Sequence, residues 1–245
     1  MMDFINENGL FIAAYSKTGP THNIHGQGNQ DRLLYGFSGD CTFFAALSDG
    51  VSSSLFAEQG SEAAVLAVKA VSDEIASGKT DISDTKELQT RIVKTWKKQF
   101  PSGWNDYAAT LNFIIFHNNK VVIGRIGDGL IVFEIDGTHR VSSVEDEFYT
   151  SITAALGETV SRKDFDIQLY SVENHFSAYM TSDGIGKEIV ESFREDVNRY
   201  LIRLVQGPED QIEQEIVQWV NVLDSKNGDD KTIMLIRWED LSCRT

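Results

Sequence analysis

The sequence has little of what would place it in several broad protein classes. Cys41 and Cys243 are its only cysteines, too few for a zinc cluster or a disulfide framework, and they fit a reduced, cytoplasmic environment. We expect neither to be a nucleophile and Cys41 to be a small core residue. No apolar run approaches the roughly 20 residues that span a bilayer. Linkers and low-complexity tracts are also lacking, so a single domain over residues 1–245 is expected.

Positive charge is scarce as well. The chain has 22 Lys and Arg against 37 Asp and Glu, a net charge of -15. Such a chain would be repelled by a phosphate backbone, which argues against a nucleic-acid partner. The hydrophobic share of 41% is enough for a sizeable globular core.

Hydrophobic periodicity predicts blocks of strands and pairs of helices. Strands are expected over 10–16, 33–37, 42–47, 110–116, 120–126, 130–135, 138–141, 165–172, 176–181 and 232–238. Helices are expected over 57–75, 86–100, 187–204 and 209–223. The Gly-rich segment 19–32 is predicted to be loop, and 107–141 a meander of consecutive antiparallel strands. Blocks of this kind favour an α+β fold with antiparallel sheets and segregated helices.

Acidic residues stand at the ends of several apolar runs. Asp49, Asp128 and Asp183 each end such a run and precede a glycine, and Asp229 stands just before the last run. Carboxylates gathered at one rim of a sheet repel unless cations lie between them, and oxygen ligands without His or Cys suit Mg²⁺ or Mn²⁺. Asp-Gly is also a common turn sequence, and Asp136-Gly137 is interpreted as only a turn. The residues alone leave both interpretations open.

A set of short motifs runs in a fixed order from about Tyr15 to Ile236. The motifs are Asn29-Gln30-Asp31, Leu47-Ser48-Asp49-Gly50-Val51, Tyr107-Ala108-Ala109-Thr110-Leu111, Ile126-Gly127-Asp128, Ala155-Leu156-Gly157, Thr181-Ser182-Asp183-Gly184 and Asp229-Asp230-Lys231-Thr232. Together they resemble the type 2C (PPM-type) metal-dependent Ser/Thr protein phosphatases. Gly19 and His22, ahead of the first motif, resemble a bacterial branch of that family.

The resemblance implies an α-β-β-α sandwich, two antiparallel sheets flanked by helices, with a dinuclear Mg²⁺ or Mn²⁺ centre. Asp49 would bridge both metals, and the backbone carbonyl of Gly50 would bind one of them. Asp183 and Asp229 would complete the protein ligands of the other metal.

Two further acidic residues complete the implied site. Asp31 would act on the metals directly or through another ligand, and Asp128 matches the family's ligand for a third, looser ion. A hydroxide bridging the two cations would attack phosphorus in line, without a covalent phospho-enzyme. The implied activity is hydrolysis of phosphoserine and phosphothreonine in proteins. The implied partners are the phosphorylated substrate and a cognate Ser/Thr kinase.

The sequence departs from the family pattern where the phosphate should bind. Family members usually have a phosphate-gripping Arg five residues before Asp31, where this chain has Gly26. His22, His25 and Arg32 are the candidates to replace it. His22 is also a candidate to protonate the leaving group.

Two more positions differ from the pattern. Gln30 replaces a usual Glu, and Val51 replaces the His that some eukaryotic members have after Asp-Gly. These departures motivate a second hypothesis, a catalytically weak or silent regulatory module that binds a phosphoprotein or a kinase. A third is a two-metal phosphodiesterase or small-molecule phosphatase.

Overall fold

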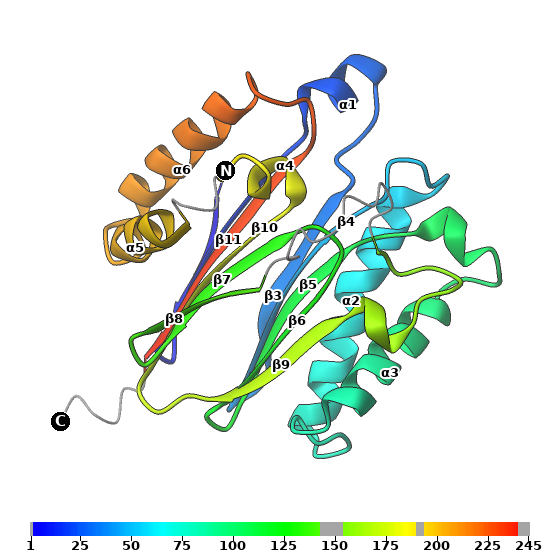
Figure 1. Ribbon diagram of the computed structural model, residues 1–245. Helices are drawn as coiled ribbons and strands as arrows, with labels where there is room; N and C mark the ends of the chain where they lie inside the picture. The colour runs from blue at the N-terminus through cyan, green and yellow to red at the C-terminus, as the bar shows by residue number, and fades with distance from the viewer. Residues whose placement is uncertain (1, 143–153, 190–193, 240–245) are drawn as a thin grey trace. The chain divides into compact units, whose positions relative to one another are not determined.

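The computed structural model describes residues 2–142, 154–189 and 194–239, and its strands form two antiparallel sheets (Figure 1). The chain divides into two compact units, each with one sheet. Unit 1 comprises Met1–Asn29, Leu130–Ser142 and Val172–Thr245, and unit 2 comprises Gln30–Gly129 and Ser143–Ser171. Each unit is assembled from segments that alternate along the sequence. That the two units form a single domain stays a prediction.

Unit 1 contains a six-stranded sheet. Across the sheet the strands are β1 (Asp3–Glu7), β2 (Leu10–Lys17), β11 (Lys231–Glu239), β10 (His175–Thr181), β7 (Leu130–Ile135) and β8 (Thr138–Ser142). The described helices of this unit are α1 (Pro20–His25), α4 (Asp183–Gly186), α5 (Arg194–Leu204) and α6 (Glu209–Leu223). Figure 1 shows α5 and α6 on one face of this sheet, and α6 contributes Ile212, Ile216 and Val220 to a buried core.

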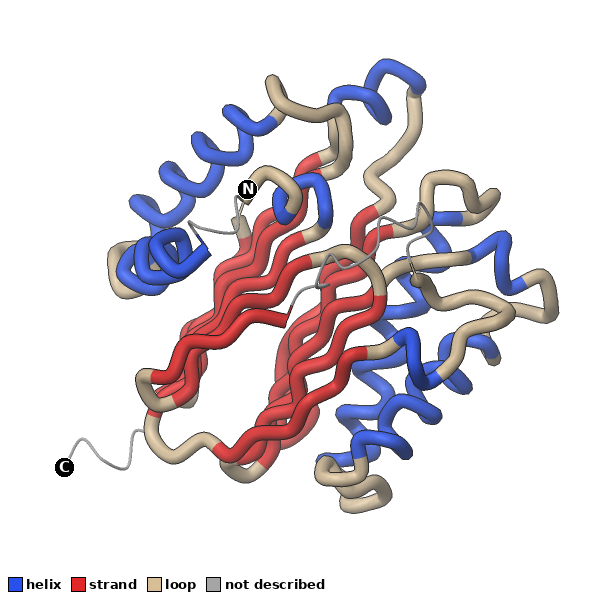
Figure 2. Tube along the Cα trace, viewed as in Figure 1, coloured by secondary structure: helices blue, strands red, loops and turns tan. Residues whose placement is uncertain are grey.

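Unit 2 contains a five-stranded sheet. Its strands, in spatial order, are β3 (Asp31–Gly39), β4 (Thr42–Asp49), β5 (Leu111–His117), β6 (Lys120–Ile126) and β9 (Asp166–Ser171). The described helices of this unit are α2 (Ala57–Ala76) and α3 (Thr85–Lys97), with 3₁₀ turns at Trp104–Tyr107 and Arg162–Asp164. Figure 2 shows α2 and α3 on one face of the sheet.

The predicted apolar faces of these helices form the core of unit 2. In α2, Ala64, Val68, Val71 and Ile75 recur at intervals of three or four and are at most 2% exposed. Such spacing places side chains on one face of a helix. In α3, Leu88, Ile92 and Trp96 recur at intervals of four and are 0% exposed. The prediction of an α+β fold, with two antiparallel sheets flanked by helices, is confirmed.

The predicted meander over 107–141 is wrong at one step: β5 pairs with β6 and β7 with β8 as predicted, but β6 and β7 are not neighbours. β6 pairs with β5 and β9 in unit 2, whereas β7 pairs with β8 and β10 in unit 1. Between the two strands Gly127 has φ +107°, and a Cβ added there would lie 2.6 Å from Thr110 Cβ, so the chain leaves the first sheet where only glycine fits. Both runs are apolar, and apolarity does not reveal which strand lies alongside.

The predicted loop over 19–32 is also wrong in part, because residues 20–25 form α1. Pro20 is at the start of the helix and Gly26 follows its end with φ +67°. Proline at the first helical position and a left-handed glycine after the last are known helix boundaries. Both signals are present in the sequence.

Three smaller expectations need correction. The helix predicted from residue 187 does not begin there: residues 187–189 form a turn and bend, residues 190–193 lie outside the described residues, and α5 begins at Arg194. The N-terminal strand β1 was not predicted. Cys41 is exposed in the β3–β4 turn, not buried in the core. In the described part of the chain, no helix is long and apolar enough to cross a membrane.

The Asp136-Gly137 pair is a turn, as predicted. Both residues have positive φ, 45° and 81°, between β7 and β8. The Asp136 carboxylate accepts backbone N–H bonds from Glu173 at 2.8 Å and from Asn174 and His175 at 2.9 Å. Burial acts to raise the pKa of Asp136, but these donors lower it below its ordinary value of 3.8.

We expect Asp136→Asn to lower the melting temperature by about 2–5 °C near neutral pH. Because the folded-state pKa is depressed, the carboxylate stabilises the fold above its unfolded-state pKa, and this contribution is lost as pH falls through the folded-state pKa. Thermal unfolding at about pH 7 and about pH 3 should therefore give a difference between wild type and variant that shrinks in acid. A difference that grows in acid would contradict this role, and Asp40→Asn, at an exposed turn carboxylate, is the control.

Candidate active site

Two acidic residues meet at the open end of the β3–β4 hairpin. Asp31 begins β3, Asp49 ends β4, and the two are register partners across the strand pair. Cross-strand partners have their Cβ atoms about 4.5–5.5 Å apart on one face of the sheet. Asp31 is only 3% exposed, whereas Asp49 is half-buried at the rim. The hairpin therefore brings together two predicted site residues from opposite strands.

The turn after Asp49 is braced by the predicted Ala-Ala-Thr motif. The backbone N–H of Asp49 donates to Thr110 Oγ1 at 3.1 Å, and Thr110 N–H donates to the Asp49 carbonyl at 2.8 Å. Gly50 lies against α2, where an added Cβ would be 2.4 Å from the Ala57 carbonyl oxygen. Only glycine fits there. Ala109 forms one β-bridge with Gly50 and another with Leu156, so it links the Ala-Leu-Gly motif to the turn after Asp49.

Asp128 follows β6 in the same unit. It lies near the guanidinium of Arg125, which is 6% exposed and donates to the Gly127 carbonyl at 2.5 Å. Burial lowers the pKa of Arg125, while the charges of Asp166 and Asp128 raise it in opposition. Asp128, the predicted ligand for a third ion, therefore has the buried guanidinium of Arg125 as a neighbour.

In unit 1 the other two predicted ligands lie in adjoining segments. Asp183 begins α4 and is 8% exposed. A Cβ added at Gly184 would lie 2.0 Å from the carbonyl oxygen of Asp230 and 3.4 Å from Asp229 Cβ. The Asp183-Gly184 turn is thus packed directly against the loop that contains Asp229. The Asp183 carboxylate also forms an ion pair with the ammonium of the exposed Lys187.

The Asp229 loop is held by a buried lysine that the sequence analysis did not single out. Lys231 is 0% exposed, and its ammonium donates to the carbonyls of Asn227 and Asp229 at 3.1 and 2.9 Å. It also lies 3.3 Å from a carboxylate oxygen of Asp224. A buried ammonium with three oxygen partners fixes the backbone of this loop.

His22 lies beside Asp230, another residue to which the sequence analysis gave no role. His22 Nδ1 lies 2.9 Å from Asp230 Oδ2, and the N–H of Gly19 donates to Asp230 Oδ1 at 2.7 Å. His22 and Asp230 are 8% and 1% exposed. Because the Asp230 carboxylate lies beside Nδ1, Nε2 is the ring nitrogen that faces away from it and is left to act on a ligand. The Asp-Asp sequence was the available signal, but only the first aspartate had been assigned a role.

The other phosphate-binding candidates are placed differently. His25 is exposed at the end of α1. Arg32 is ion-paired with Glu58 and donates to the Asp31 carbonyl at 2.8 Å. Gly26 has left-handed backbone geometry, which an arginine would adopt only with strain. The usual phosphate-binding arginine is therefore disfavoured at this position by the local backbone.

The donor types fit a hard divalent cation. Across residues 2–142, 154–189 and 194–239, no group of three or more His, Cys, Asp and Glu side chains is arranged to hold a metal ion. The acidic residues occur instead as pairs, Asp31 with Asp49 and Asp183 beside Asp229. Mg²⁺ is commonly bound by one or two carboxylates and several waters, so pairs of this kind suit it.

Comparisons with known proteins give one family and many similar folds. The family described as protein phosphatase 2C matches residues 18–221. No curated protein matches the chain by sequence. RsbX, solved in complex with magnesium, is similar at TM-score 0.65 and 14% identity, covering 98% of this chain and 100% of its own.

Two further solved structures show the same likeness. The S. agalactiae serine/threonine phosphatase has TM-score 0.64 and 15% identity, with 93% of this chain and 98% of its own covered. The catalytic domain of the serine/threonine protein phosphatase PstP, in complex with 2 manganese ions, has TM-score 0.57 and 16% identity, with 93% and 97% covered. At these identities the likeness shows the fold.

The packing of Gly184 against the Asp229 loop can be tested by adding one methyl group. We expect Gly184→Ala to lower the free energy of unfolding by about 1–3 kcal/mol, because the new Cβ meets backbone that must move. Gly186→Ala is the matched control in the same helix, since its Cβ would meet side-chain atoms at 3.1 Å and 3.2 Å. Urea denaturation of both variants checks this, and equal stabilities would contradict the close approach.

Proposed function

The chain belongs to the protein phosphatase 2C family, and we propose that it hydrolyses phosphoserine and phosphothreonine in proteins with Mn²⁺ or Mg²⁺ as cofactor. The main support is the family match together with the cross-strand pairing of Asp31 and Asp49. Magnesium in RsbX and manganese in PstP support a divalent cofactor. A phosphorylated protein substrate follows from the proposal, and a cognate Ser/Thr kinase stays a prediction.

The proposed metal ligands are Asp49, the Gly50 carbonyl, Asp183 and Asp229. Asp31 supports Asp49 from the neighbouring strand, and Asp128 is proposed to serve a third ion. Such cations, when bound, would supply a nucleophile by lowering the pKa of a coordinated water. Within the chain, Thr110 and Gly50 fix the position of Asp49.

His22 is the residue we propose for the phosphate or its leaving group. The Asp230 carboxylate lies 2.9 Å from Nδ1, so it sits on that side of the ring and leaves Nε2 to donate a hydrogen bond or proton. Arg32 is the weaker candidate because Glu58 already pairs with its guanidinium. Asp230 is thus a positioning residue that acts through His22.

The central test is Mn²⁺-dependent hydrolysis of p-nitrophenyl phosphate and a phosphothreonine peptide. We expect Asp49→Asn to lower kcat/KM by about 100-fold or more, because one negative metal ligand is lost. Asp40→Asn, in the closed turn of the same hairpin, should retain full activity. Full activity in Asp49→Asn would contradict the proposal. Faster hydrolysis of bis-p-nitrophenyl phosphate would instead favour a phosphodiesterase.

The His22–Asp230 pair is tested by a double-mutant cycle. We expect His22→Ala to lower kcat/KM by roughly 100-fold, since a positioned acid typically contributes about that much. Asp230→Asn should have a smaller effect alone and almost none in the His22→Ala background, because it acts through the ring. Additive losses in the double variant would show that Asp230 has a separate role.

A second candidate function is a catalytically weak or silent module that binds a phosphoprotein or kinase. The observation that favours it is the left-handed geometry of Gly26, which disfavours the usual phosphate-binding arginine. Calorimetry with a phosphothreonine peptide separates the two functions. Heat of binding without phosphate release at any Mn²⁺ concentration would support the silent module.

A further inference from the structure

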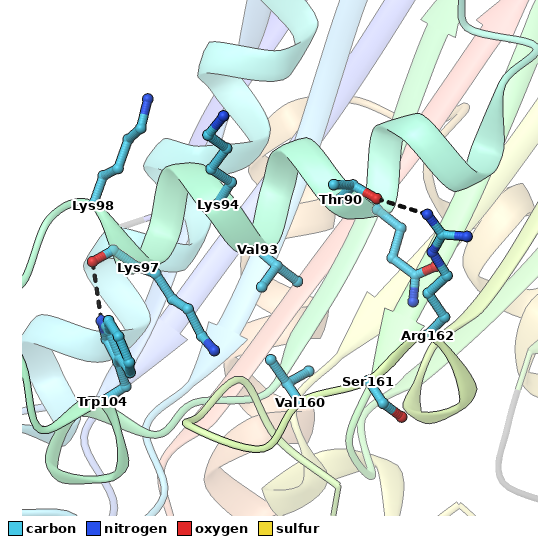
Figure 3. A pocket seen from close by; sticks show the side chains of 10 residues that line it. Thr90, Val93, Lys94, Lys97, Lys98, Trp104, Val160, Ser161 and Arg162 are labelled. Atoms are coloured by element: carbon cyan, nitrogen blue, oxygen red, sulfur yellow. Dashed lines mark hydrogen bonds between the residues drawn. The ribbon is translucent and has the colours of Figure 1, made fainter.

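A groove of about 600 Å³ lies on unit 2, along α3 and beside residues 160–162 (Figure 3). Its size is within the range of roughly 300–1,000 Å³ that ligand pockets have. Every residue that lines it belongs to unit 2, and none is among the proposed metal or phosphate ligands. The phosphatase proposal therefore leaves this groove unexplained.

The groove concentrates positive charge in an acidic protein. Lys94, Lys97, Lys98 and Arg162 line it, and no acidic residue does, although the chain has a net charge of -15. Low-dielectric walls lined by one sign of charge focus the electrostatic field on a ligand of opposite sign. The lining is thus complementary to an anion.

Two of these cations are fixed at the two ends of the groove. Lys97 Nζ lies 4.8 Å from the centre of the Trp104 ring and donates to the Glu158 carbonyl at 2.9 Å. Trp104 Nε1 donates in turn to the Lys97 carbonyl at 3.1 Å. At the other end Arg162 donates to Thr90 Oγ1 at 3.3 Å. Both charges are held by neutral partners, so neither is neutralised by these contacts.

The other two cations, Lys94 on α3 and Lys98 just after its last residue, extend outward. Figure 3 shows the Lys94 and Lys98 side chains pointing away from Val93 and Val160. In the described ranges their ammonium groups have no ion pair with an acidic side chain. Flexible lysine stems can follow a ligand along the rim at little cost.

The floor of the groove is apolar and includes one unsatisfied donor. Val93 and Val160 point toward one another across the groove, as Figure 3 shows. Gln89 also lines the groove and is 6% exposed, and its amide nitrogen has no hydrogen-bond partner among the described residues. A buried donor without a partner is costly, and an incoming carbonyl or carboxylate oxygen would satisfy it.

We propose that this groove binds an acidic peptide segment that contains an apolar side chain. Thr90 to Lys98 span about 12 Å of helix at 1.5 Å per residue, which equals roughly four residues of extended chain. The apolar side chain would lie on Val93 and Val160, and the flanking carboxylates would meet the cations. A nucleic acid fits poorly, because the rest of the molecule would repel its phosphates.

The inference does not depend on phosphatase activity and is tested by binding alone. The probe is a fluorescein-labelled peptide of about eight Asp and Glu residues around one phenylalanine, followed by anisotropy. The groove variant is Lys94→Glu/Lys98→Glu. Its control is Lys79→Glu/Lys86→Glu, which makes the same change in net charge at exposed residues outside the groove.

We expect the groove variant to weaken peptide binding by roughly tenfold, and the control by less than about twofold. Binding should weaken with salt, and should be lost when Gln and Asn replace the acidic residues of the peptide. Equal weakening in both variants, unchanged binding after Phe→Gly in the peptide, or no binding would overturn the proposal. Tighter binding of a DNA oligonucleotide or of anionic vesicles at the groove would overturn it too.

Discussion

Asp31 and Asp49 are cross-strand partners, so two carboxylates lie side by side where the β3–β4 hairpin opens. Like charges directly opposite one another destabilise a strand pair, and burial of Asp31 increases the cost. The surrounding contacts nevertheless fix the backbone around Asp49, through Thr110 on one side and the close approach of Gly50 to Ala57 on the other. Such bracing of an unfavourable charge pair is what a preformed cation site requires.

The sequence predicted the elements well where the signal is local. The apolar periodicity of α2 and the aspartates at strand ends depend on neighbouring residues, and both predictions agree with the structure. Strand pairing depends on distant residues instead. Nothing in the two apolar runs shows that β6 and β7 belong to different sheets, and turn residues between them suggested a hairpin.

The candidate site divides in the same way. The paired carboxylates could be predicted because their motifs are short and ordered along the chain. Asp230 could not, because its role comes from contacts with Gly19 and His22, which are far away in sequence. The helix α1 is an intermediate case, since Pro20 and Gly26 marked its ends but the segment resembled a polar loop.

The departure at Gly26 and the groove on α3 suggest how the family's chemistry is adapted here. With no arginine at that position, His22 and its buried partner Asp230 form the proposed phosphate contact. The basic groove provides a separate place where an acidic segment could be held, so that selectivity would come from docking as well as from the phosphate itself.

The most direct test of the central claim is the melting temperature of wild type and Asp49→Asn, measured once in EDTA and once in excess Mn²⁺. If the carboxylate pair exists to hold a cation, the variant should melt higher than wild type in EDTA, because repulsion is relieved, and lower than wild type in Mn²⁺. A variant that melts below wild type by the same amount in both conditions would contradict the account.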